Sequence, residues 1–123
     1  MSNPLPAPIV VVIGAGIAGL LAARELSHAG AAVVVVDKGR GVGGRMATRR
    51  SDGAVFDHGA QFLTARSVDF RSEVALWEAA GVATPWFTGR LGSDGVDDSD
   101  DLVRHRGVPA MTGIAKHLAT GLD

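Results

Sequence analysis

The first candidate site is a run of six residues near the start of the chain, Gly14-Ala15-Gly16-Ile17-Ala18-Gly19. It has the G-x-G-x-x-G spacing, in which each glycine has its own physical reason. Gly14 permits a tight turn, Gly16 lets a pyrophosphate approach the backbone, and Gly19 lets a helix pack against a strand. A helix that begins here offers free N–H groups and about half a positive charge to a phosphate. The run therefore predicts a dinucleotide site.

An acidic residue, Asp37, follows this run at about the 20-residue spacing typical of such sites. A carboxylate in that place can accept hydrogen bonds from a ribose diol, and it would repel a 2′-phosphate. The alternative is a glycine-rich turn that binds nothing. The acid and the predicted elements around the run favour the dinucleotide site over this alternative.

A second glycine cluster, Gly43-Gly44-Arg45, lies shortly after Asp37. Two adjacent glycines let the main chain pass closely over a bulky cofactor, and an arginine can reach a phosphate or a flanking ring. The surrounding segment is basic and contains no acid from 38 to 51, since it carries Lys38, Arg40, Arg45, Arg49 and Arg50. This charge suits a pyrophosphate, although a solvated basic loop remains an alternative, above all for the last two arginines.

The elements that must position these residues are two apolar strands and a helix. Ile9–Ile13 and Ala32–Asp37 are rich in β-branched residues and predict strands that are buried on both faces. An amphipathic helix is expected between them, over Ile17–Ala29, with Gly30 as its end. This order predicts a βαβ unit with a parallel pair and a right-handed crossover.

Shorter elements are expected in the rest of the chain. Ser67 caps a predicted helix that buries Phe70, Val74 and Trp77 and ends at Gly81. A last amphipathic helix runs from Met111 to Gly121. The predicted strands are Ala54–Phe56, Trp86–Leu91 and Leu102–Val108, with an acidic turn over 93–101 between the last two and an irregular segment over 38–45.

Composition limits the chemistry that the chain can perform alone. Its 123 residues, 46% of them hydrophobic, allow one domain, and without cysteine it has no disulfide, Cys-ligated zinc, iron–sulfur cluster or thiol nucleophile. No metal site is expected, because the four histidines have no ligand spacing. Redox chemistry would therefore need a bound organic cofactor. The formal charge of −1 argues against nucleic acid as a partner.

The N-terminal segment indicates neither export nor a membrane span. It lacks a basic region before its apolar stretch, and Pro4, Pro6 and Pro8 interrupt its start. We therefore expect a soluble cytoplasmic protein. The oligomeric state is not indicated.

Three separated runs together resemble the N-terminal half of renalase-like FAD-dependent oxidoreductases, within the flavin amine-oxidase class. They are Gly14 to Gly19 with Asp37, then Gly41-Val42-Gly43-Gly44-Arg45-Met46-Ala47-Thr48-Arg49-Arg50, then Phe56-Asp57-His58-Gly59-Ala60-Gln61-Phe62. The likeness continues through Gly107-Val108-Pro109-Ala110-Met111 and the helix after it.

The resemblance implies FAD as the cofactor and assigns its contacts. The backbone of Ala15 to Ala18 would meet the pyrophosphate, Asp37 the adenosine ribose, and Arg45 the phosphate and ribityl region, while Ala60, Gln61 and Phe62 would lie near the isoalloxazine ring. The expected cofactor-binding residues are Gly14, Ala15, Gly16, Ile17, Ala18, Gly19, Asp37, Lys38, Gly43, Gly44, Arg45, Met46, Ala60, Gln61 and Phe62.

In that family the flavin takes a hydride from a reduced or isomeric nicotinamide dinucleotide, or in relatives from an amine, and passes the electrons to oxygen. The chemistry belongs to the flavin, so no residue of the chain is predicted to be catalytic. His58 is expected to be structural. Trp86 either lines a substrate pocket or packs in the ordinary way.

The implied fold is α/β: a Rossmann-like FAD-binding fold with a parallel sheet, followed by the start of an antiparallel substrate-domain region. Residues 1–62 would form the dinucleotide-binding unit, and 63–123 a helix, short antiparallel strands and a helix that leads toward a further sheet strand. In the family that strand and a substrate domain follow, so we expect the 123 residues alone to bind FAD weakly and to turn over no substrate.

Two other functions remain open from the residues. An NAD(P)-binding module of a reductase would use the first glycine run and Asp37 in the same way but would leave Gly43-Gly44-Arg45 without a role. A non-catalytic dinucleotide-sensing module would keep the cofactor and transmit its binding through the acidic turn and Trp86.

Overall fold

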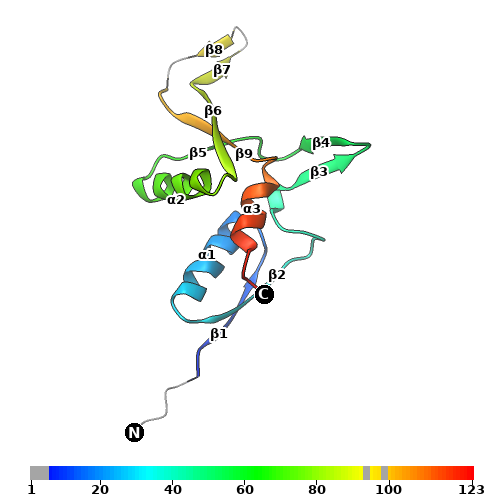
Figure 1. The fold of residues 1–123 in the computed structure, drawn as a ribbon, viewed down its shortest axis with the longest axis vertical. Coiled ribbons are helices and arrows are strands. Elements are labelled where there is room, and N and C mark those ends of the chain that lie inside the picture. The colour runs from blue at the N-terminus through cyan, green and yellow to red at the C-terminus, as the bar shows by residue number, and fades with distance from the viewer. Residues whose placement is uncertain (1–5, 93–94, 98–99) are drawn as a thin grey trace.

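A computed structural model describes residues 6–92, 95–97 and 100–123, and it has the expected α/β architecture (Figure 1). Strand β1 (Ile9–Ile13), helix α1 (Ile17–His28) and strand β2 (Ala32–Val36) form the predicted βαβ unit. The two strands are parallel, with Ile9 opposite Ala32 and Ile13 opposite Val36. The crossover helix and the parallel pair are thus confirmed.

The expectation that these strands are buried on both faces is wrong. Ile9 is 79% exposed, Val11 57% and Ile13 87%, whereas Val33, on the opposite face, is 9% exposed. Helix α1 covers one face of the pair (Figure 1). An unbroken apolar run shows that both faces of a strand are apolar, but it does not provide a second layer to cover them.

A second region contains the predicted antiparallel sheet. Its strands are ordered β5 (Leu63–Thr64), β9 (Val103–Gly107), β6 (Ala83–Thr88), and both pairings are antiparallel. Helix α2 (Val68–Ala79) precedes β6 and is capped as predicted, since Ser67 Oγ accepts a hydrogen bond of 3.2 Å from Phe70 N. The antiparallel start of a further region is therefore confirmed.

Along the chain, a β-hairpin follows the βαβ unit and precedes β5, and only its second strand was predicted from the sequence. A short 3₁₀ helix, η1 (Gly44–Met46), interrupts the segment expected to be irregular and leads into β3 (Thr48–Ser51), which pairs with β4 (Ala54–Asp57). Asp52 and Gly53 join the strands with φ angles of 51° and 79°, as a two-residue hairpin turn requires. The Asp-Gly pair is the signal that predicts such a hairpin.

The predicted strands around the acidic turn are shifted and more numerous. The first, expected over Trp86–Leu91, divides into β6 and β7 (Arg90–Gly92), and β7 pairs with β8 (Gly95–Asp97) inside the segment expected to be a turn. Residues 93–94 and 98–99 of that turn lie outside the described residues.

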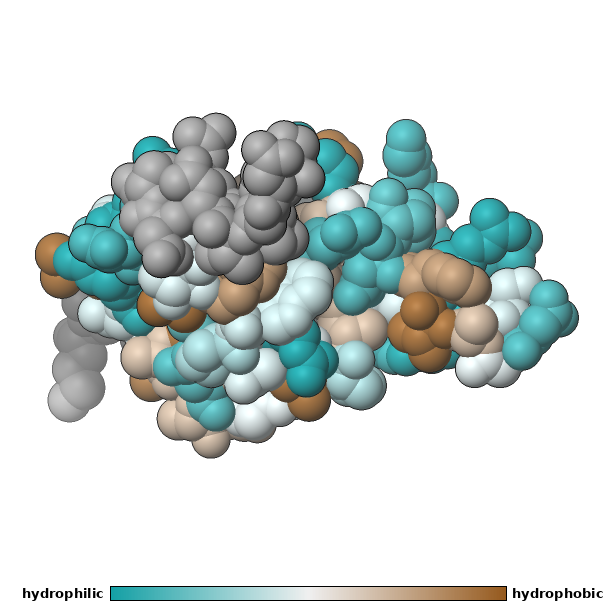
Figure 2. Space-filling view, turned by 90° about the horizontal axis from the view of Figure 1, so that it is seen from above, coloured by the Kyte–Doolittle hydropathy of each residue, from teal (hydrophilic) through white to brown (hydrophobic). Residues whose placement is uncertain are grey.

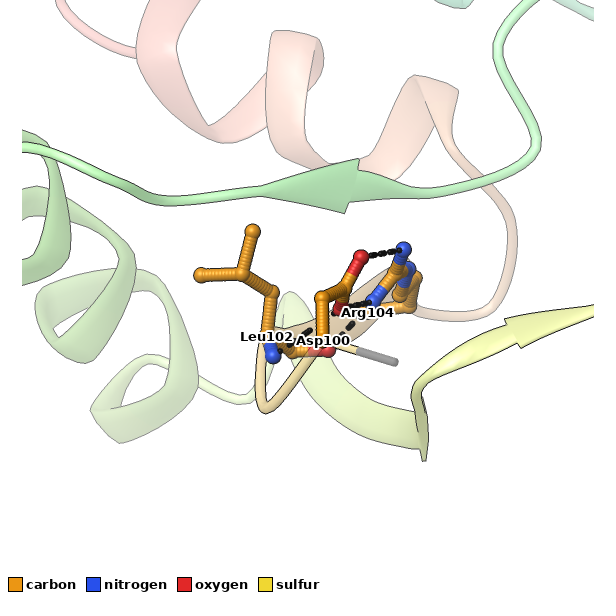
Figure 3. A network of polar contacts seen from close by, with 3 residues as sticks. All are labelled: Asp100, Leu102 and Arg104. Carbon is orange, nitrogen blue, oxygen red and sulfur yellow. Dashed lines mark hydrogen bonds and ion pairs between the residues drawn. The ribbon is translucent and has the colours of Figure 1, made fainter. Parts of the chain in front are cut away.

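A buried arginine fixes the chain where it enters β9 (Figure 3). Arg104 is 8% exposed; its Nη2 donates to Asp100 Oδ2 at 2.9 Å and its Nη1 donates to the Leu102 carbonyl at 2.6 Å. A second bond joins Arg104 Nη1 to Asp100 Oδ1. These bonds to the Asp100 carboxylate raise the pKa of Arg104, and the charged guanidinium holds the loop against the strand.

Helix α3 (Thr112–Ala119) lies between the βαβ unit and the antiparallel sheet (Figure 1). Met111, Ile114 and Leu118 are each fully buried in one core cluster with Leu20 of α1 and Trp77 of α2. The core therefore contains residues from both of the expected parts of the chain, 1–62 and 63–123. No helix in the described ranges is long and apolar enough to cross a bilayer.

Candidate cofactor-binding site

The glycine run forms the turn from β1 into α1, as predicted. Helix α1 has Gly16 as its N-cap, and its first intrahelical bond runs from Leu20 N to Gly16 O at 2.9 Å. A Cβ at Gly19 would lie 1.9 Å from the Gly14 carbonyl oxygen, so only glycine allows the helix to pass this close to the turn. At Gly16, in contrast, a Cβ would meet nothing within 4 Å.

The space in front of this turn suits a phosphate. The N-terminus of α1 has no side-chain cap and no acidic residue in its first turn, so its N–H groups and the helix dipole face no negative side chain from within the helix. A cavity of about 270 Å³ lies there. Its lining residues are Ile13, Gly14, Gly16, Ile17, Ala18, Gly19, Gly43, Arg45 and Met46.

The second glycine cluster lies directly against the first. Gly43 N donates to the Ala15 carbonyl at 2.8 Å, and Gly43 forms a β-bridge with Gly16. Gly43 and Gly44 have φ angles of 123° and 53°, which residues with a side chain rarely adopt. A Cβ at Gly44 would lie 3.4 Å from Gly16 Cα. The two clusters, far apart in sequence, therefore form one backbone surface.

The third predicted segment joins the same surface through the backbone. Ala60 N donates to the Arg45 carbonyl at 2.8 Å, and a Cβ at Gly59 would lie 2.1 Å from that oxygen. Gln61 is exposed and Phe62 is 43% exposed, so both side chains are accessible. Met46, in contrast, is 6% exposed and packs in the core as well as lining the cavity.

The Asp37 carboxylate, which is predicted to bind a ribose, accepts two hydrogen bonds from the backbone of this chain. Its Oδ2 accepts a hydrogen bond of 2.7 Å from Ala15 N, and its Oδ1 accepts one of 2.6 Å from Gly39 N. These two bonds, with a smaller contribution from the charge of Lys38, lower the pKa of Asp37. Each carboxylate oxygen keeps capacity for a second donor, such as a ribose hydroxyl.

The surroundings of Asp37 are open. A cavity of about 690 Å³ extends from Asp37 toward α3, and a second of about 230 Å³ reaches from Asp37 to the end of the chain. The larger one is basic, and its lining includes Lys38, Arg40, Arg50 and Lys116. Lys116 is a binding candidate that sequence reasoning missed, because α3 lies far from the glycine runs in sequence.

Acid should loosen the glycine turn at Asp37. Because the pKa of this carboxyl is lower in the folded chain, its hydrogen bonds contribute stability above about pH 4, and that contribution is lost as the pH falls through the folded value. We expect the amide signals of Ala15 and Gly39 to titrate together by NMR, with a midpoint below 3.8. In Asp37→Asn this titration should be absent, and a midpoint at or above the ordinary value would contradict the bonded geometry.

A further cavity, of about 320 Å³, lies beside Gln61. Aromatic side chains form part of its wall: Phe56 of β4 is 53% exposed and Trp86 of β6 is 51% exposed. Arg106 of β9 adds an exposed cation. Seen from above, the β3–β4 arm on the right of the view carries hydrophobic surface (Figure 2). Val55 and Phe56 of β4 are each 53% exposed.

The chain is similar to flavin-linked and amine-oxidising proteins. Putrescine oxidase of Kocuria rosea is 43% identical over 75 residues, which are 61% of this chain and 15% of that protein. A putative flavin-containing monoamine oxidase of Mycobacterium tuberculosis is 46% identical over 63 residues, 51% of this chain and 14% of that protein. The chain thus spans about a seventh of the length of these two relatives.

A solved structure supports the fold assignment. Wild-type putrescine oxidase bound to putrescine superposes with a TM-score of 0.52 at 28% identity, over 80% of this chain and 21% of that chain. The family model described as an NAD(P)-binding Rossmann-like domain matches residues 12–78, which contain the end of β1, then α1, β2 and all three cofactor segments. On this match, and with the geometry of the glycine turn, the chain belongs to the family of NAD(P)-binding Rossmann-like domains.

Proposed function

We propose that this chain is the FAD-binding portion of a renalase-like oxidoreductase of the flavin amine-oxidase class. The observation that carries the proposal is the single backbone surface formed by the two glycine clusters and the segment after Gly59. FAD is long enough to need all three segments, whereas the first glycine run with Asp37 suffices for the adenosine diphosphate part of any dinucleotide. The flavin-containing relatives support the same choice.

The structure offers a fit for each part of this cofactor. The open Cβ position at Gly16 and the uncapped N-terminus of α1 suit the pyrophosphate, and Arg45, which lines the same cavity, adds a positive charge. Asp37, with its remaining acceptor capacity, suits the ribose. Gln61 and Phe62 directly follow Ala60, which is bonded to Arg45, and this connection supports our assignment of both residues to the ring end of the cofactor.

When bound, FAD supplies the redox chemistry: it accepts a hydride from substrate and passes electrons on to oxygen. The residues described here bind and orient it. Backbone N–H groups and Arg45 neutralise phosphate charge, and the glycine clusters keep side chains out of its path. No residue of the chain needs to act as a general acid or base in this role.

The aromatic cavity beside Gln61 supports a substrate with a planar ring and a negative charge. Phe56 and Trp86 offer ring faces, and Arg106 is exposed there. Among the described residues that line the cavity, Asp57 has the only carboxylate, and it is bonded to Thr48 Oγ1 and Met111 N. A reduced or isomeric nicotinamide dinucleotide suits these two aromatic side chains and this cation better than a cationic amine, which Arg106 would repel. The dinucleotide is therefore our proposed substrate, the amine the alternative, and oxygen the proposed acceptor.

Binding can be tested on the full chain by NMR titration with FAD and, separately, with NAD. We expect FAD to shift amides of 15–19, 43–46 and 60–62, with a dissociation constant that a weak-binding titration can measure. NAD should shift only the first group and the surroundings of Asp37. Equal affinity for both, with no shift in 60–62, would favour the NAD(P) module, and no binding of either would contradict the proposal.

A further inference from the structure

Three polar side chains from separate elements form a hydrogen-bonded network next to two of the cofactor segments. They are Thr48 at the start of β3, Asp57 at the end of β4 and Thr112 at the start of α3, and we call them the threonine–aspartate clasp. Thr48 Oγ1 donates to Asp57 Oδ1 at 2.5 Å. Thr48 N donates to Thr112 Oγ1 at 2.9 Å, and Thr112 N donates to Thr48 Oγ1 at 3.1 Å.

The clasp also forms hydrogen bonds with the main chain of η1 and with the main chain just before α3. Thr112 Oγ1 donates to the Met46 carbonyl at 3.1 Å, which ties it to η1. Met111 N donates to both oxygens of Asp57 at 3.2 Å. Helix α3 has no side-chain cap of its own, so Asp57 provides a negative charge at its N-terminus from another element.

Two of the three cofactor segments have one end at this network. The Gly43–Met46 segment is bonded to the glycine turn through Gly43 N at its start and to Thr112 through Met46 O at its end. The segment that carries Ala60 begins directly after Asp57 and returns to Arg45 O. A shift of the clasp would therefore move Arg45 relative to both the glycine turn and Gln61.

We propose that the threonine–aspartate clasp positions the three cofactor segments relative to one another, with Asp57 and Thr112 as positioning residues. The inference about flavin rests on the proposed function, but the inference about the segments does not. The backbone N–H of each threonine donates to the hydroxyl oxygen of the other, so loss of either hydroxyl leaves the N–H of the other without its acceptor. The network is therefore sensitive to removal of a single oxygen.

The test compares Thr112→Val, which replaces the hydroxyl by a methyl group, with Thr112→Ser, which keeps the hydroxyl. Amide hydrogen exchange is measured first without any flavin. In Thr112→Val we expect exchange at Thr48 and Ala60 to rise at least about tenfold, while amides of β1 and α1 stay unchanged. Thr112→Ser should exchange like the unmodified chain, and so should Thr120→Val, which removes an exposed hydroxyl bond at the other end of α3.

A second measurement separates the clasp from the proposed cofactor. FAD titration of the same variants should show an affinity at least about tenfold lower for Thr112→Val, worth about 1.4 kcal/mol, and recovery in Thr112→Ser. If the unmodified chain binds no FAD but the exchange pattern appears, the proposed function fails and the clasp stands. If exchange rises everywhere alike, or Thr112→Val retains full affinity, the clasp inference is overturned.

Asp57→Asn provides an independent variant should Thr112→Val not fold. It preserves the shape of the side chain but removes the charge and replaces one acceptor oxygen by an NH2 group. Because Met111 N is bonded to both oxygens of Asp57, this second donor faces Met111 N whichever oxygen is replaced. The same local rise in exchange is expected at Thr48 and Ala60. Unchanged exchange there would contradict the proposal.

Discussion

Gly19→Ala is expected to lower the free energy of unfolding by about 3 kcal/mol, at the upper end for forced overpacking. The new Cβ would lie 1.9 Å from the Gly14 carbonyl oxygen and 3.4 Å from Val12 Cγ1. The nearer atom is backbone, so no side-chain rotation relieves the clash. Helix α1 must instead move away from β1, which disturbs Leu20, a residue buried in the core. Urea unfolding followed by circular dichroism measures the loss.

Gly16→Ala is the matched control for this prediction. It adds the same methyl group in the same turn, but nothing lies within 4 Å of its Cβ. The backbone of Gly16 has φ −78° and ψ 175°, an extended conformation that alanine adopts freely. Its unfolding free energy should fall by less than about 1 kcal/mol, the cost of an unfavourable N-cap residue. Equal losses in the two variants would contradict close packing at Gly19 as the cause.

Local signals predicted the parts of the fold that depend on neighbouring residues. The β-branched run of β1, the glycine turn and the cap at Ser67 each express a short-range preference, and all three lie where the sequence placed them. The hairpin β3–β4 was available from the same kind of signal, since Asp52-Gly53 suits its turn. The sequence analysis predicted only its second strand, over Ala54–Phe56, after a segment over 38–45 that its glycines indicated to be irregular.

Contacts between distant elements could not be predicted in this way. Nothing near Thr112 in sequence indicates that its hydroxyl bonds to Met46, 66 residues earlier, or that Asp57 caps α3. Nor does the spacing of Asp37 reveal that its carboxylate folds back onto Ala15. Composition of a strand likewise says nothing of whether a second layer covers it, which is why Ile13 was expected to be buried and is not.

Gly16→Val should separate cofactor binding from stability. The two methyl groups on its Cβ project into the cavity in front of the glycine turn, where Gly16 faces Ile17 and Gly43 and where we propose that the pyrophosphate lies. A phosphate held by helix N–H groups must approach the backbone closely, so the added side chain prevents the hydrogen bonds between the phosphate and these N–H groups. We expect FAD affinity to fall at least about 100-fold, or about 2.7 kcal/mol.

The measurement is the NMR titration of the full chain at the FAD concentration that half-saturates the unmodified protein. Gly16→Val should show no shift at the amides of 17–19, whereas its urea unfolding should stay within about 1 kcal/mol, because the open Cβ position costs little packing. Ser27→Ala, at the other end of α1, is the control and should bind as before. Retained FAD binding in Gly16→Val would place the pyrophosphate away from the glycine turn. Combined loss of binding and of stability would instead mean that position 16 is packed, against the open geometry described here.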